Sequence, residues 1–171
     1  MSSNVKRLAT VSDRFSKWGG IMDFQDLMEF KGYIYLNKLI EPEGNSLRVL
    51  IDRCKVNKTK GLMKITGEVE IEASSIDVDN NLPIVQLDFE TYVAYSITNE
   101  SFTVMDDYEI SEGRIFRIYS KSRYLDFIKT GTIAEFIFPE EQFVHYQIPC
   151  LNHIIDIISY DEPKITGIKR N

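Results

Sequence analysis

Hydrophobic and polar residues alternate most regularly along residues 84–98. The apolar positions share one parity, which only Thr91 interrupts, and they are Val85, Leu87, Phe89, Val93, Tyr95 and Ile97. A period of two is typical of a β-strand with one face in the core and the other toward water. The pattern therefore predicts one long strand across this stretch.

Shorter β-rich segments precede and follow this strand. Residues 33–40 and 46–54 flank the turn-forming sequence Glu41-Pro42-Glu43-Gly44-Asn45, which predicts a hairpin. A polar loop at residues 56–61 and a strand at residues 62–78, with a bulge at Gly67, are expected next. Further strands are expected at residues 102–105, 115–120 and 143–160. Pro149 is expected to bend or interrupt the last of these.

One helix is expected near residues 122–130. Ser120 or Ser122 can cap its start and Gly131 can end it, while Tyr124, Phe127 and Ile128 give it an apolar face. Strands do not alternate with helices of crossover length, so a doubly wound α/β fold is not expected. The predicted fold class is mainly β (α+β), an antiparallel sheet or sandwich with one packed helix. A helical or partly ordered segment, residues 1–22, precedes a single β-rich domain, residues 23–171.

Length and composition support this reading. A chain of 171 residues can bury roughly 70% of its unfolded surface, so stability requires neither disulfides nor a metal. Cys54 and Cys150 are far apart in the sequence and are expected to be free thiols in a reducing compartment. No apolar run has the length of a signal peptide or a membrane span, so we expect a cytoplasmic protein without a membrane partner.

Charge is distributed in blocks along the chain. The net charge of −6 disfavours nucleic acid as a partner, because phosphates repel an acidic protein. Residues 31–64 hold eight Lys or Arg and three acids, whereas residues 68–112 hold twelve acids and no Lys or Arg. Residues 113–133 are basic again. The acidic block is balanced either by these basic segments or by a basic partner.

The acidic block also has strand periodicity. Glu68, Glu70 and Glu72 share one parity, and Asp88, Glu90 and Tyr92 share one parity on the long strand. If these strands lie in one sheet, their outward faces form an acidic surface that carries a tyrosine. Such a surface steers a basic protein toward it, and tyrosine adds contact area at low entropic cost. These six residues are the predicted partner-binding site, and a merely solvated sheet face is the simpler alternative.

The start of the predicted helix offers a second site. Ser120, Ser122 and Arg123 surround free backbone N–H groups, which together with the helix dipole favour an anion such as phosphate. No glycine-rich loop precedes them, so an ordinary helix cap is the alternative. An enzyme built here would use His145 or His153 as its acid–base group, provided that a pocket brings that histidine to Ser122 and Arg123.

The remaining candidates for chemistry have poor spacing. His145 and His153 would lie roughly 26 Å apart on a straight strand, and Cys150 would face away from His153. The series Asp77, Asp79, Asn81, Asp88 matches a calcium loop in its offsets, but Leu82 occupies the glycine position. The sequence therefore assigns no catalytic residue, no metal site and no cofactor, and leaves enzymatic activity uncertain.

Three runs resemble an uncharacterised family of small cytoplasmic proteins from low-GC Gram-positive bacteria. They are AYSITNESFTVMDDYE, EGRIFRIYSKSRYLDFI and LNHIIDIIS, and they are most specific in SKSRYLDFI and NHIIDIIS. The resemblance covers most of the chain after about residue 24. It implies no activity, cofactor or site residue, although small acidic bacterial proteins of this sort are sometimes immunity proteins for toxins.

These observations favour a non-catalytic intracellular binding protein for a basic protein partner, with a toxin-immunity role as one form. One alternative is a small-molecule or phosphate-binding domain, or an enzyme, that uses the basic helix start at residues 120–123. A structural homo-oligomer joined through exposed strand edges is the other alternative.

Overall fold

The computed structural model describes residues 23–170 except Glu68, Met105 and Asp106. The segment predicted at residues 1–22 lies outside the described residues. Side chains of Thr66 and Val69 are likewise left out of the description.

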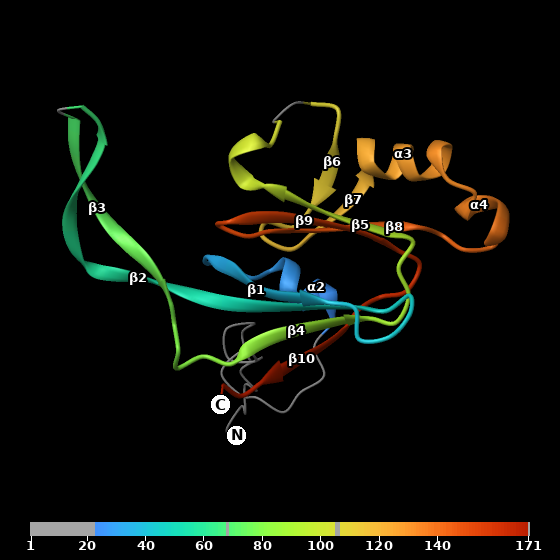
Figure 1. Ribbon diagram of the computed structural model, residues 1–171, viewed down its shortest axis with the longest axis horizontal. Coiled ribbons are helices and arrows are strands. Elements are labelled where there is room, and N and C mark those ends of the chain that lie inside the picture. Colours follow the sequence, from blue (N-terminus) through green and yellow to red (C-terminus); the bar gives the residue numbers. More distant parts are fainter. Residues whose placement is uncertain (1–22, 68, 105–106, 171) are drawn as a thin grey trace, which may run out of the picture.

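Two antiparallel sheets stack on one another (Figure 1). The first contains β1 (Ile34–Ile40), β2 (Leu47–Thr66), β4 (Ile84–Phe89) and β10 (Lys164–Ile168) in that order, with β3 (Val69–Val78) paired to β2. The second has the order β5 (Ala94–Asn99), β9 (His153–Ser159), β8 (Val144–Pro149), β7 (Arg117–Lys121) and β6 (Ile110–Glu112). The predicted β-rich α+β class is confirmed.

The main core lies between the two sheets. Alternating residues of β2 and β4 point into it, among them Val49, Ile51 and Leu87, and they meet Ile148 and Ile155 of the second sheet. The short helix α2 (Phe24–Met28) adds Phe24, Leu27 and Met28 to this core, and the Phe24 ring contacts the Tyr146 ring edge-on at 4.8 Å. Inward faces of both sheets are therefore fully covered.

A smaller core lies on the outer face of the second sheet. There α3 (Arg123–Gly131) and α4 (Ala134–Ile137) cover β8 and β9 (Figure 1). Leu125 and Ile128 of α3 and Ala134 of α4 pack there with Phe143 and with Ile158 of β9. The helix predicted at residues 122–130 is confirmed. Its apolar face is not entirely as predicted, because Leu125 takes the buried position and Phe127 is 59% exposed.

The single strand predicted across residues 84–98 is wrong. β4 and β5 belong to different sheets, and residues 90–93 carry the chain from one layer to the other. Thr91 and Val93 fasten this crossing, since Ser159 Oγ donates to the Thr91 carbonyl at 2.8 Å and the Val93 N–H donates to Ile158. Of the residues that continue the alternation, Tyr95 packs on the main core, Val93 packs on the smaller core and Ile97 is 44% exposed.

The second correction concerns β2, which has 20 residues. The predicted loop at residues 56–61 is part of this strand, and Gly67 forms the turn into β3 rather than a bulge. Gly67 has φ +57°, a left-handed conformation that glycine adopts without a steric penalty. The outer half of β2 and β3, residues 54–78, project from the sandwich as a two-stranded ribbon (Figure 1). We call residues 54–78 the arm.

The remaining elements include one wrong prediction, one confirmed prediction and one strand that was not predicted. The strand expected at residues 102–105 is wrong, because Phe102 ends the 3-10 helix η1 (Glu100–Phe102) and Thr103 and Val104 belong to no strand. Residues 143–160 are interrupted after Pro149, as predicted, and form the β8–β9 hairpin. Strand β10 was not predicted and pairs with β4. Within the part of the chain that is described, no helix has the length and apolar character needed to cross a bilayer.

Candidate functional site

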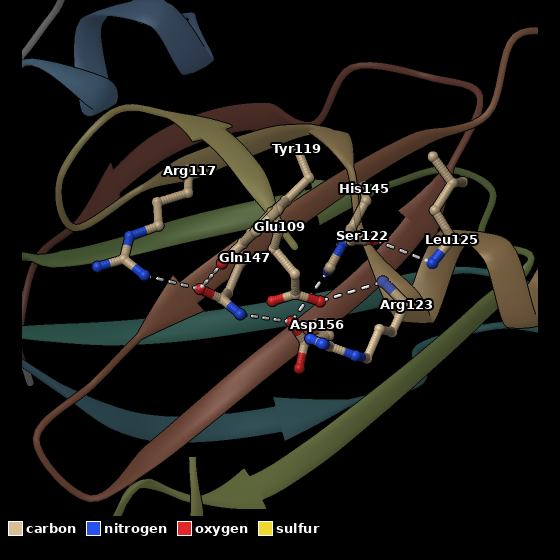
Figure 2. Close-up of polar contacts among 9 residues, drawn as sticks. All are labelled: Glu109, Arg117, Tyr119, Ser122, Arg123, Leu125, His145, Gln147 and Asp156. Carbon is tan, nitrogen blue, oxygen red and sulfur yellow. Dashed lines mark hydrogen bonds and ion pairs between the residues drawn. The ribbon is translucent and has the colours of Figure 1, made fainter. Parts of the chain in front are cut away.

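A chain of hydrogen bonds joins α3 to the outer face of the second sheet. Ser122 Oγ lies 2.7 Å from Nδ1 of His145, and Nε2 of His145 lies 2.9 Å from Oδ1 of Asp156 (Figure 2). His145 is 2% exposed, and the Tyr119 ring stacks on its imidazole at 4.6 Å between centroids. The residue types are those of a serine–histidine–aspartate triad.

Strand register explains why these residues meet. Gln147 pairs with Asp156 across β8 and β9, and His145 is two residues before Gln147 on the same outward face. Gln147 Nε2 donates to Asp156 Oδ1 at 2.8 Å, so this carboxylate oxygen accepts two hydrogen bonds. Ser122 is the N-cap of α3, and its Oγ accepts the Leu125 N–H at 3.0 Å.

One proton arrangement satisfies every member of this chain. A neutral His145 with its proton on Nε2 donates to Asp156, and its Nδ1 accepts the hydroxyl proton of Ser122. The same Ser122 oxygen accepts from Leu125. A proton on Nδ1 instead would leave the Ser122 hydroxyl hydrogen without this acceptor. The geometry therefore selects the Nε2–H tautomer.

The buried position of Ser122 decides what this chain of residues does. Ser122 is 0% exposed, and its oxygen is engaged by both the histidine and the helix N-terminus. A nucleophile must be reached by its substrate, which complete burial of this oxygen prevents. The hydrogen bonds instead fix the first turn of α3 against β8 and β9. Ser122 and His145 do meet, which the enzyme alternative required, but they meet in a buried contact that holds the helix in place.

The predicted anion site at the helix start is occupied by the protein itself. Oε1 of Glu109 accepts the backbone N–H of Arg123 at 3.1 Å, where a bound anion would sit (Figure 2). Lys121 and Arg123 both lie over the ring of Tyr108, at 4.1 Å and 4.5 Å from its centroid. Ser120 Oγ donates to the carbonyl of Ile110 at 3.3 Å. These contacts leave the three predicted residues engaged with side chains and backbone of their own chain.

The other candidate catalytic and metal-binding residues do not come together into a site. His145 of β8 pairs with Ile158 near the end of β9, whereas His153 begins β9, so the two histidines lie at opposite ends of the β8–β9 hairpin. Burial raises the pKa of the Cys150 thiol to about 12, which opposes formation of a thiolate. Among the described residues, no three His, Cys, Asp or Glu side chains are grouped to hold a metal ion.

Asp79, from the series that matches a calcium loop in its offsets, lies in the turn between β3 and β4. Oδ1 of Asp79 accepts from the backbone N–H of Asn81 at 3.1 Å and lies 3.7 Å from Nζ of Lys55. The hydrogen bond to Asn81 lowers the pKa of Asp79 below its ordinary value. This carboxylate therefore stabilises the turn between β3 and β4.

The structure places the predicted acidic residues in two separate regions. β3 and β4 both pair with β2, but Glu72 lies opposite Leu62 in the arm whereas Asp88 lies opposite Arg48 in the sandwich. Fourteen positions of β2 separate these two partners, so the two acidic groups do not form one surface. Glu68 lies outside the described residues.

Most of these acids have partners within the chain. Glu70 and Glu72 lie 3.6 Å and 3.7 Å from the amines of Lys64 and Lys60, their cross-strand or diagonal neighbours. Asp88 pairs with Arg48 at 2.5 Å between Oδ1 and Nε. Tyr92 donates to Oε1 of Glu41 at 2.8 Å, and this bond raises the pKa of the phenol. Glu90 is exposed. The basic segment 31–64 thus balances much of the acidic block internally.

A groove of about 590 Å³ lies beside α3, on the outer face of the second sheet. Its apolar lining residues include Ile118, Leu125 and Phe143. Its acidic lining residues are Glu112, Glu135, Glu140 and Glu141. Lys129 is the lysine of this lining, and its Nζ lies 3.7 Å from Oε1 of Glu135. The groove therefore combines an excess of negative charge with apolar lining residues.

Exposed apolar side chains continue this surface beyond the groove. α4 and the residue before it present Ile133, Phe136 and Ile137 to solvent, and Phe136 is 86% exposed. Glu135, which lines the groove, lies between them in the sequence. These three exposed apolar side chains fall within five residues of the sequence, and exposed apolar patches mark interaction sites. We call the groove together with these three residues the α3–α4 face.

Comparison of the chain with protein-family models, with curated proteins and with solved structures found no match. The site is therefore interpreted from its own residues. Asp156 was not predicted, although it is the charged residue within the run IIDII, where every neighbour is buried or half-buried apolar. A charged residue within an otherwise apolar strand was the sequence signal that could have identified Asp156. The α3–α4 face had no such signal, because its four glutamates come from three separate segments.

Proposed function

We propose that this chain is a non-catalytic intracellular binding protein that holds a basic protein partner on its α3–α4 face. The observation that carries the proposal is the composition of the groove, whose lining contains four glutamates, one lysine and several apolar side chains. Lysine and arginine side chains have the matching chemistry, because their apolar stems pack on apolar side chains while their charged ends meet carboxylates.

The exposed residues beside the groove support a protein rather than a small cation. Phe136 is the most exposed of them and can enter a pocket on the partner, as the aromatic anchors of protein interfaces do. Ile133 and Ile137 extend the apolar contact around it. A free organic cation would fill the groove without covering these residues.

The buried Ser122–His145–Asp156 chain has a role in this proposal. It holds the first turn of α3 on the sheet, and α3 forms one wall of the groove through Leu125 and Lys129. A rigid wall lowers the entropic cost of binding. The cytoplasm is the expected compartment, and an immunity-type role follows if the basic partner is a toxin domain.

Affinity capture from a cell lysate, on three immobilised forms of this protein, tests the proposal. The wild type is compared with Phe136→Glu and with Phe102→Glu, a control that adds the same charge at a 78% exposed phenylalanine in η1. We expect a basic protein to bind the wild type and the Phe102 variant, to be lost from the Phe136 variant, and to elute at moderate salt. Equal capture by all three proteins, or a captured protein that is not basic, would contradict the proposal.

A further inference from the structure

We infer that the arm joins two copies of this chain through one of its faces. The arm extends away from the sandwich (Figure 1), and β3 pairs with β2 alone. A two-stranded ribbon without further cover is at best marginally stable in water. A partner that covers one face of the arm shields it from water and so stabilises the ribbon.

The two faces of the arm differ in chemistry. Cross-strand register places Met63 opposite Ile71 and Gly61 opposite Ala73, all on one face. We call these four residues the apolar strip. The opposite face carries the ion pairs Lys60–Glu72 and Lys64–Glu70. Met63 is 53% exposed, so the strip is open to solvent along the described part of the chain.

Charge favours a second copy as the occupant. By sequence, residues 54–78 contain four lysines and four acids, so the arm is neutral within a chain of net charge −6. A neutral arm attracts neither nucleic acid nor a strongly charged partner over distance. Two copies that meet at their arms avoid the repulsion that their acidic sandwich bodies would cause. The arm is therefore a region in which two acidic chains can meet without repulsion between the contacting segments.

The arms stack face to face rather than edge to edge. In the arm β2 is an edge strand that carries Lys60 and Lys64, and lysines on an edge strand oppose pairing with the same strand of another copy. Face-to-face stacking with the tips in opposite directions buries both apolar strips and leaves the ion pairs outside. It also keeps the two bodies, and both α3–α4 faces, apart. The strip is much smaller than the roughly 800 Å² per partner of a standard interface, so the dimer dissociates on dilution.

Sedimentation of the full chain from micromolar to millimolar concentration tests this inference. Met63→Glu is compared with Leu62→Glu, its neighbour on the opposite face, which is 72% exposed. We expect the wild type and the Leu62 variant to shift from one chain toward two as concentration rises, while the Met63 variant stays at one. Ile71→Glu repeats the test from β3, and thermal melting checks that each variant is folded.

Two results would overturn the inference. The first is a wild type that stays monomeric at every concentration, and the second is an equal effect of the Leu62 and Met63 substitutions. Neither result bears on the proposed function, because the α3–α4 face lies outside the arm. The dimer and the basic partner therefore succeed or fail separately.

Discussion

Nδ1 of His145 on β8 lies 2.7 Å from Oγ of Ser122, the N-cap residue of α3. This contact joins a strand in the centre of the second sheet to the helix that walls the groove. Because both side chains are buried, neither can exchange its partner for water at low cost. The Ser122 hydroxyl group therefore holds the first turn of α3, in addition to the burial of Leu125 and Ile128.

Replacement of Ser122 by alanine is expected to lower the free energy of unfolding by about 2 kcal/mol. The variant loses the cap of the Leu125 N–H and leaves His145 Nδ1 without its donor. Ser120→Ala is the matched control, because Ser120 is exposed, and it should cost less than about 0.5 kcal/mol. Urea unfolding measures both, and equal effects would show that the buried hydrogen bonds do not hold the helix.

Asp156→Ala is expected to change the tautomer of His145 as well as the stability. The wild-type ring should carry its proton on Nε2, since Asp156 accepts from that atom at 2.9 Å. Without this acceptor the Nδ1–H form gains population, because Nδ1–H can donate to Ser122 Oγ. Long-range proton–nitrogen NMR of the neutral ring distinguishes the two forms. A wild-type ring protonated on Nδ1 would contradict the hydrogen-bond assignment.

Cys150 is expected to resist thiol reagents in the folded protein. Burial raises its pKa to about 12, so at pH 8 the thiolate fraction is about 10⁻⁴. The folded pKa is raised, so the buried thiol stabilises the fold below the pKa of a free thiol. That stability is lost as the pH rises toward 12. A Cys54→Ser variant isolates this thiol, and its modification should follow global unfolding. Rapid labelling of the native variant would show that the site opens locally.

Local patterns in the sequence were enough to predict part of the fold. The cap and the apolar spacing of α3 lie within a few residues of one another, and the β1–β2 turn contains its own signals. The break between β4 and β5 could not be predicted from alternation, because Tyr95 of β5 continues the parity of Leu87 and Phe89 into the same core. The length of β2 was also missed, since the lysines of the arm were interpreted as a loop.

The site depended on contacts between distant segments. Ser122, His145 and Asp156 come from three elements, and only the β8–β9 register brings the last two together. The acidic residues were identified correctly as a block, but their pairing with Lys60, Lys64 and Arg48 follows from the path of β2. Separation in the sequence therefore limited the prediction of the site more than that of the fold.

The most direct test of the proposed function is the association rate of the captured basic partner at low salt. Glu140→Lys with Glu141→Lys, in the groove, is compared with Glu70→Lys and Glu90→Lys, from the surface predicted by the sequence. Both double variants change the net charge equally. We expect the groove variant to slow association about tenfold or more, and the other to change it by less than about twofold. The reverse order would contradict the α3–α4 face and restore the surface predicted from strand periodicity.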